Sequence, residues 1–139
     1  YLEDILGRKD VAGRRLCFEI TETVAISHFG RAREFIDTLR RFGCRIALDD
    51  FGSGMSSFGY LKNLPVDDLK IDGSLVRNIV DDPADRAMVT AIHQVGRVLG
   101  VRTIAEFVET EAVQRSLCEI GVDYAQGYAI HRPEPLPGD

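Results

Sequence analysis

Short apolar segments of strand character alternate with longer segments of helical periodicity along this chain, and that order constrains the fold more than any other feature. Such alternation predicts an α/β fold in which a parallel sheet is built through right-handed crossovers. The pattern alone leaves open whether the sheet is an open doubly wound sheet or a closed eight-stranded barrel. Strands are expected at residues 16–20, 44–48, 66–72, 101–105 and 122–125. Helices are expected from Ser27 or a nearby threonine to residue 42, and at residues 58–64, 83–99 and 110–120.

Each of the five expected strands ends in a polar residue. In both architectures the carboxyl ends of parallel strands form one edge, and ligand sites lie at that edge. Five polar side chains delivered to one edge therefore favour a shared polar site over five separate helix caps. The residues at the strand ends are Glu19, Asp49, Lys70, Glu106 and Gln126.

Two adjacent carboxylates, Asp49 and Asp50, end the second strand, and a turn rich in glycine and serine follows them. Side chains alternate along a strand, so the pair cannot point the same way while regular strand geometry holds. An unpaired carboxylate costs several kcal/mol to bury, which makes a bound cation one natural partner. The alternative is that Asp50 caps the next helix while Asp49 pairs with a Lys or Arg.

Lys70 is an isolated charge within an apolar strand, between Leu69 and Ile71. An ion pair with Asp49 or Asp72 is one interpretation; a positive charge that faces a phosphoryl oxygen or an attacking water is the other. Carboxylate oxygens suit Mg²⁺ or Mn²⁺ better than zinc. The three histidines lack the spacing of metal ligands and are expected to pack or face solvent; they are His28, His93 and His131.

Composition excludes several classes of protein. The 139 residues carry 17 basic and 22 acidic side chains, a net charge of -5, which argues against binding a nucleic-acid polymer. No apolar stretch is long enough to span a bilayer. Three dispersed cysteines, expected to be buried thiols, indicate a reducing compartment and hence the cytoplasm; they are Cys17, Cys44 and Cys118.

Three further segments carry weaker signals. Asp50-Phe51-Gly52 matches the metal-binding tripeptide of protein kinases, but the chain lacks a kinase catalytic loop and nucleotide loop. The glycines at 52 and 54 lack the third glycine of a dinucleotide-binding loop, although such a turn can offer N–H groups to a phosphate. Asp67 and Asp68 are expected to be solvated loop charges, and Tyr1 to Gly7 the end of a helix.

Six motifs, in this order, closely resemble those of the EAL-domain family, whose members are cyclic di-GMP phosphodiesterases. The resemblance covers nearly the whole chain. It implies a TIM-like (β/α)8 barrel that uses two Mg²⁺ or Mn²⁺ ions to convert cyclic di-GMP to linear pGpG. The motifs are Phe18-Glu19-Ile20-Thr21-Glu22-Thr23, Leu48-Asp49-Asp50-Phe51-Gly52-Ser53-Gly54, Leu61-Lys62-Asn63-Leu64-Pro65-Val66-Asp67, Leu69-Lys70-Ile71-Asp72, Ile104-Ala105-Glu106-Phe107-Val108-Glu109 and Gln126-Gly127-Tyr128.

The resemblance also implies roles for single residues. Glu19 corresponds to a ligand of the first metal ion, Asp49 to the carboxylate that bridges both ions, and Asp50 to a ligand of the second. Glu106 corresponds to a second-metal ligand that is also proposed as general base, and Lys70 to the group that holds the attacking water.

Other residues are expected to line or support that site. Glu22 corresponds to the anchor of the loop after Asp50, a loop linked in the family to metal binding and dimerisation, so a homodimer through this loop and neighbouring helices is expected. Phe107 stands where the family often has Gly; it either narrows the pocket or packs, and packing is the favoured interpretation. Met55 stands where an aromatic residue is usual. The residues expected to line the site are Gln126, Asp72, Gly52, Gly54 and Ser56.

The family's Glu-Ala-Leu strand and an Asn ligand have no counterpart in the sequence. We therefore expect residues 1–139 to be the C-terminal part of a single EAL domain, with about five β/α units and without the N-terminal barrel strands. Such a fragment is expected to be inactive alone, and any membrane tether would lie in absent domains. Two alternatives are a catalytically silent cyclic di-GMP receptor and, more remotely, an unrelated metal-dependent barrel enzyme acting on another phosphate ester.

Overall fold

The predicted alternation of strands and helices is present in the computed structural model, which describes residues 4, 7, 16–53 and 58–131. Most of the predicted helix end at residues 1–7 lies outside the described residues, and so does Met55. In chain order the elements are β1 (Cys17–Thr21), α2 (Glu22–Ser27), α3 (Phe29–Arg41), β2 (Arg45–Phe51), the 3-10 helix η2 (Phe58–Asn63), β3 (Asp68–Ile71), α4 (Gly73–Val76), α5 (Pro83–Leu99), β4 (Arg102–Ala105), α6 (Glu111–Ile120) and β5 (Tyr124–Ala125).

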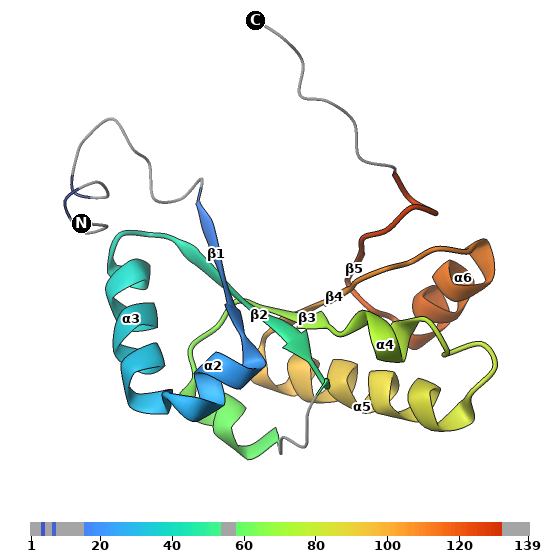
Figure 1. Ribbon diagram of the computed structural model, residues 1–139, viewed down its shortest axis with the longest axis horizontal. Helices are drawn as coiled ribbons and strands as arrows, with labels where there is room; N and C mark the ends of the chain where they lie inside the picture. Colours follow the sequence, from blue (N-terminus) through green and yellow to red (C-terminus); the bar gives the residue numbers. More distant parts are fainter. Residues whose placement is uncertain (1–3, 5–6, 8–15, 54–57, 132–139) are drawn as a thin grey trace, which may run out of the picture.

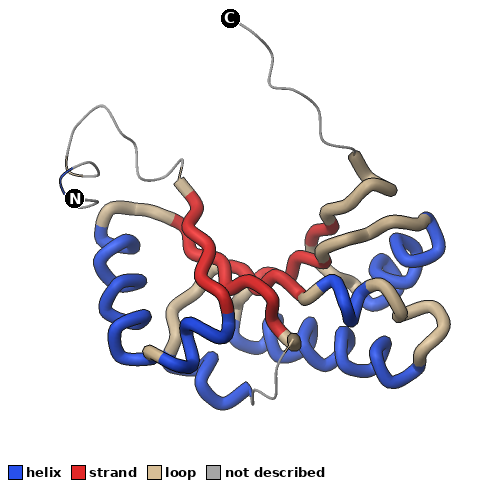
Figure 2. The backbone as a smooth tube through the Cα atoms, viewed as in Figure 1, coloured by secondary structure: helices blue, strands red, loops and turns tan. Residues whose placement is uncertain are grey.

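The five strands form one sheet in sequence order, β1 to β5, and every neighbouring pair is parallel. Helices connect successive strands, and α3, α5 and α6 follow one side of the curved sheet (Figure 1). The tube view separates the central strands from the helices that flank them (Figure 2). The predicted α/β class with parallel strands is therefore confirmed, and the carboxyl ends of the strands meet at one edge, as the site hypothesis requires.

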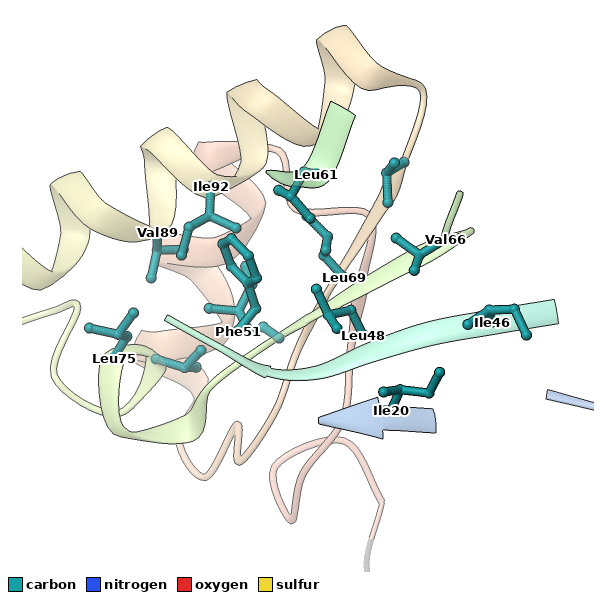
Figure 3. Packing of buried hydrophobic residues seen from close by; sticks show 14 of the residues in the cluster. Ile20, Ile46, Leu48, Phe51, Leu61, Val66, Leu69, Leu75, Val89 and Ile92 are labelled. Carbon is teal, nitrogen blue, oxygen red and sulfur yellow. The ribbon is translucent and has the colours of Figure 1, made fainter. Parts of the chain in front are cut away.

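The core lies between the sheet and its helices. Leu48 and Leu69 on neighbouring strands are fully buried, and Phe51 lies near Val89 and Ile92 of α5 (Figure 3). Strands of a parallel sheet that helices cover contain continuous apolar runs, and in β2 the buried residues Ile46, Ala47 and Leu48 form such a run. This packing fixes the strand ends from which the polar side chains project.

Helix ends follow the local signals in the sequence. Asp82 caps α5 by accepting hydrogen bonds from the N–H groups of Ala84 and Asp85, and Pro83 occupies the first turn. Gly100 ends this helix in the left-handed conformation, with φ of 73°. Thr110 caps α6 through the N–H of Val113. These predicted helix boundaries are confirmed.

The helix predicted to start at Ser27 or a nearby threonine starts at the threonine that ends β1. Thr21 caps α2 directly after β1 by accepting a hydrogen bond from the Val24 N–H at 3.4 Å. The chain then leaves helical geometry at His28, where φ is -133°, and α3 starts at Phe29. The expected start at a threonine is thus confirmed at Thr21, whereas Ser27 is the last residue of α2 and does not cap a helix. The short helix α4 was not predicted.

Asp67 and Asp68 are not solvated loop charges. Asp68 is 4% exposed and forms ion pairs with Arg45 and Arg102 at 3.0 and 2.9 Å. Asp67 accepts a hydrogen bond from the Ile46 N–H and pairs with Arg40. Both residues tie strands together at the amino ends, and that expectation was therefore wrong.

The cysteines and histidines agree with the sequence expectations only in part. Cys44 is buried as predicted, but Cys17 and Cys118 are exposed, and none of the three forms a disulfide. His93 is buried, with its Nδ1 atom 2.8 Å from Thr103 Oγ1, so it has the predicted packing role. Within the described part of the chain, no helix is both long and apolar enough to cross a membrane.

Candidate active site

A β-bulge at the end of β2 brings the two adjacent carboxylates together. Leu48 pairs with Leu69 and Phe51 with Ile71, so β2 takes three steps where β3 takes two. Asp50 occupies the bulge with a φ of 55°, in the left-handed region that few residues other than Gly, Asn and Asp adopt. The bulge interrupts the alternation that would otherwise separate the side chains of the pair.

Glu106 completes a cluster of three carboxylates. It follows β4, and its N–H donates to the Ile71 carbonyl at 3.4 Å, which continues the sheet by one residue. One ligand atom each from Asp49, Asp50 and Glu106 lies within 4.8 Å of the others, and all three residues are half-buried. Three oxygen donors at this separation form a suitable binding site for a hard divalent cation.

Lys70 lies between two carboxylates from different strands. Its Nζ atom is 2.7 Å from Glu19 Oε1 and 3.1 Å from Glu106 Oε1, and its side chain is 10% exposed. Lys70 therefore joins β1, β3 and the end of β4. An ion pair with Asp49 or Asp72 was one of the two interpretations of Lys70, and the ion pairs that form are with Glu19 and Glu106 instead. Glu19 contacts the carboxylate cluster through Lys70.

The crowding of charges changes the protonation of the site. Burial raises the pKa of Glu106 to about 7, and the hydrogen bond and charge of Asp49 add to this effect, while Lys70 opposes it. Burial alone would lower the pKa of Lys70, but its hydrogen bonds to Glu19 and Glu106 raise it, so the ammonium stays charged. Burial, followed by the charges of Asp49 and Asp72, raises the pKa of Asp50. Without a cation, the cluster thus favours holding a proton.

Glu22 holds the turn that follows Asp50. The side chain is 2% exposed, and its oxygens accept hydrogen bonds from the Gly52 N–H at 3.2 Å and the Tyr60 hydroxyl at 2.8 Å. Gly52 has a φ of 95°, which glycine adopts without strain. The contact between Glu22 and this loop agrees with the predicted anchor. Gly54 and Ser56, also predicted to line the site, fall outside the described residues.

Asp72 and Gln126 follow β3 and β5, the strands next to those that carry the cluster. The Asp72 N–H donates to the Phe51 carbonyl at 2.9 Å, and its carboxylate accepts from the Ser74 hydroxyl. Gln126 extends the pairing of β4 and β5, because its N–H donates to the Ala105 carbonyl at 2.8 Å. Asp72 is close enough to act on the charge of Asp50, and Gln126 lines a cavity together with Glu106.

A cavity of about 380 Å³ opens beside Glu106. Phe107, with a φ of 56° and 56% exposed, forms part of its wall, and a Cβ atom on residue 73 would overlap the Phe107 ring. Phe107 therefore packs on Gly73, as expected, but also narrows the cavity. The residues that line it are Arg77, Glu106, Phe107, Glu109, Gln126, Gly127 and Tyr128.

Sequence reasoning missed two residues around the site. Tyr60 lay unremarked within an expected helix, and nothing in the sequence indicated that its hydroxyl would bond Glu22. Arg77 lay in a segment with no predicted element, and only the turn through α4 brings it to the cavity. Neither position follows from periodicity, because both depend on how loops fold over the sheet edge.

Together, the fold and the site define a parallel α/β protein with an oxygen-donor centre at the carboxyl ends of its strands. A family model narrows this class: the model described as EAL domain matches residues 1–133. The chain belongs to the EAL domain family. The predicted membership is therefore confirmed, and with it the TIM-like barrel class, of which the five parallel strands and the helices between them are a part.

Two curated relatives illustrate the similarity. The chain is 51% identical over 127 residues to cyclic di-GMP phosphodiesterase PdeB of Shewanella oneidensis, which covers 91% of the chain and 15% of that protein. It is 38% identical over 135 residues to cyclic di-GMP phosphodiesterase PdeF of Escherichia coli, covering 97% of the chain and 18% of that protein. The chain thus spans less than a fifth of the length of these two relatives.

Solved structures agree with the family assignment. A structure described as PaMucR phosphodiesterase in complex with c-di-GMP matches with a TM-score of 0.89 and 37% identity, over 97% of this chain and 55% of that one. BlrP1 of Klebsiella pneumoniae, described as a manganese and cyclic di-GMP complex, matches with a TM-score of 0.83 and 32% identity, over 91% and 32% of the two chains.

Proposed function

We propose that the chain forms part of a metal-dependent phosphodiesterase domain that hydrolyses cyclic di-GMP to linear pGpG. The observation that carries the proposal is the cluster of Asp49, Asp50 and Glu106, with Lys70 Nζ 3.1 Å from Glu106 Oε1. The names of the relatives supply the substrate class, because PdeB at 51% identity is a cyclic di-GMP phosphodiesterase.

The proposed cofactors are two Mg²⁺ or Mn²⁺ ions. The donor set fits them, because three half-buried carboxylates converge within 4.8 Å and carry raised proton affinity at Glu106 and Asp50. Asp49, Asp50 and Glu106 would hold metal, and Glu19 would be a further ligand. When bound, such ions polarise a phosphoryl oxygen and make a water nucleophilic at neutral pH.

Lys70 would orient the attacking water, and Glu106 would deprotonate it. The Lys70 ammonium, fixed by two carboxylates, donates a hydrogen bond that orients the water, and Glu106 accepts a proton from it. The water oxygen bonds to phosphorus as the bond between phosphorus and the 3′ oxygen breaks. The departing 3′ oxygen takes up a proton, and the product keeps a 5′ phosphate. Both residues are proposed as catalytic.

The remaining predicted residues would shape the site. Gln126 and Asp72 lie beside the carboxylates and would line the space for the ligand. Glu22 fixes the Gly52 turn, whose continuation includes Gly54 and Ser56. The cavity of about 380 Å³ beside Glu106 is within the range of small-molecule sites, which supports a ligand of nucleotide size there.

Two further proposals concern assembly and location. A homodimer through the loop after Asp50 and the adjoining helices is supported by a groove between η2 and α5, whose Phe58 and Val98 are 38% and 87% exposed. A cytoplasmic location is supported by three cysteines without a disulfide. The net charge of -5 supports a small ligand over a nucleic-acid polymer.

Turnover by the complete protein tests the function. Chromatography with Mn²⁺ present is expected to record conversion of cyclic di-GMP to pGpG, abolished by a chelator and lowered at least 100-fold by Asp49→Asn. Glu119→Gln, on the exposed surface of α6, serves as the control and should match the wild type. Tight binding of cyclic di-GMP without hydrolysis would instead indicate a catalytically silent receptor. Activity only on other phosphate esters would indicate an unrelated enzyme.

A further inference from the structure

We propose that Arg77 binds the second phosphodiester of the cyclic dinucleotide while the first is held at the carboxylate cluster. This assignment rests on the proposed function and adds a specificity-determining residue to it. Arg77 lines the cavity that also contains Glu106, so it lies beside the centre on the side away from β1. The anchoring of its backbone, its uncommitted charge and the acidic residues beside it support the assignment.

The backbone of Arg77 is held in place. Its N–H donates to the Gly73 carbonyl at 2.9 Å, which makes Arg77 the C-cap of α4. The buried residues Val76 and Ile79 anchor this segment on either side, and α4 lies at the carboxyl end of β3 (Figure 1). An arginine on an anchored turn presents its guanidinium at a defined place on the cavity rim.

The charge of Arg77 is uncommitted. Among the described residues it is the only basic side chain that lines the cavity, and its guanidinium forms no ion pair or hydrogen bond with them. Lys70, the nearest other cation of the site, already contacts Glu19 and Glu106. A ligand with two negative charges therefore finds one counter-charge at the metal centre and another at Arg77.

The ligand proposed for this site carries two phosphodiesters on opposite sides of one ring. When one is placed for cleavage, the other extends beyond the carboxylate cluster into the adjoining space. Glu106 and Glu109 line that space and would repel it unless a cation is present. A guanidinium offers two parallel N–H groups that match two phosphate oxygens, which makes arginine suited to this contact.

Two aromatic residues also line the cavity. Phe107 and Tyr128 line the same cavity and are 56% and 62% exposed. Arginine can also pair with the O6 and N7 atoms of guanine, so base recognition competes with phosphate recognition as a role for Arg77. The two roles differ in what they predict for an adenine-containing ligand, which lacks O6 but keeps both phosphates.

Kinetics of Arg77→Ala and Arg77→Lys in the complete protein separate these roles. Arg77→Ala is expected to raise KM by about 10- to 100-fold for both cyclic di-GMP and cyclic di-AMP, with kcat nearly unchanged. Hydrolysis of bis(p-nitrophenyl) phosphate, which has one phosphodiester, should be unaffected. Arg77→Lys should show a smaller rise in KM than Arg77→Ala, because lysine keeps the positive charge but lacks the two parallel N–H groups of the guanidinium. Arg97→Ala, an exposed arginine outside the cavity, is the matched control.

Binding of cyclic di-GMP in Ca²⁺, measured by calorimetry, accompanies the kinetics. Unchanged KM and Kd in Arg77→Ala would overturn the assignment, and a loss confined to cyclic di-GMP would replace the phosphate role with base recognition. If the wild type binds the dinucleotide without turnover, the proposed function fails while a weakened Kd in Arg77→Ala still supports Arg77. A wild type that neither binds nor cleaves either dinucleotide overturns both proposals.

Discussion

Lys70 and Glu106 control the charge of the site at the scale of single residues. Lys70 is nearly buried, and an ammonium in that position would be unfavourable without the carboxylates at 2.7 and 3.1 Å. Glu106 therefore has two neighbours with opposite effects, since Lys70 favours its ionised form and Asp49 its protonated form. Its pKa of about 7 indicates that burial and Asp49 prevail.

The raised pKa of Glu106 has a consequence for stability in a chelator. The pKa in the folded protein, about 7, lies above its ordinary value of 4.5. The group's contribution to folding is therefore fully present below about pH 4.5 and is lost as pH rises through 7. Glu106→Gln cannot ionise, so metal-free Glu106→Gln should exceed the wild type in free energy of unfolding by roughly 1–3 kcal/mol at pH 8 and show a smaller difference at pH 5.

Urea denaturation at the two pH values measures this effect. Glu119→Gln, which removes an exposed carboxylate from α6, should follow the wild type at both. Equal free energies of unfolding for the wild type and Glu106→Gln at pH 8 would contradict this prediction, because ionisation of Glu106 would then not destabilise the folded protein.

At the scale of elements, the bulge at the end of β2 is what makes the site. A regular strand would place Asp49 and Asp50 on opposite faces, whereas the extra residue and the φ of 55° at Asp50 allow both to meet Glu106. Asn shares the tolerance of Asp for this conformation, but β-branched residues do not.

Asp50→Asn and Asp50→Val should therefore differ in stability. Asp50→Val is expected to lose about 1–3 kcal/mol more than Asp50→Asn in thermal or urea unfolding, because valine is strained at positive φ. Both variants should lose metal affinity. Equal stability of the two would contradict a left-handed conformation at this position.

The sequence was informative about elements but not about their junctions. The sequence predicted the alternation of strands and helices, the helix caps at Asp82 and Thr110, and the end of α5 at Gly100. Each of these features depends on local chemistry. The bulge was not, since a register shift depends on how two strands pair. The same holds for Lys70, whose partners come from strands far away in sequence.

Family resemblance supplied what physical reasoning from the residues left open. Two carboxylates at a strand end were compatible with either a cation or a helix cap, and the structure clusters them with Glu106. The prediction that Asp68 is a solvated loop charge was wrong, because its position in the sequence is typical of a loop. Its environment is set by Arg45 and Arg102, which lie on neighbouring strands.

At the scale of the whole molecule, the two edges of the sheet carry different charge networks. At the amino ends of the strands, Asp68 of β3 accepts hydrogen bonds from Arg45 of β2 and Arg102 of β4. These contacts join the three strands. The carboxylate cluster lies at the carboxyl ends. In barrels of parallel strands the first edge serves stability and the second serves ligand chemistry.

Asp68→Ala should separate these two edges. Burial raises the pKa of Asp68 despite the charge of Arg45, so the ion pairs offset only part of the desolvation. We therefore expect a modest loss of about 1–2 kcal/mol in urea unfolding, with the affinity for Mn²⁺ unchanged. A large loss of Mn²⁺ affinity would link the two edges and contradict their separation.

The central claim is that Asp49, Asp50 and Glu106 form a site for a divalent cation. Titration of the complete protein with Mn²⁺, followed by electron paramagnetic resonance of the free ion, tests it most directly. The wild type and Glu119→Gln should bind Mn²⁺ equally, and Asp49→Asn should bind it at least tenfold more weakly. Equal affinity of Asp49→Asn and the wild type would contradict the claim.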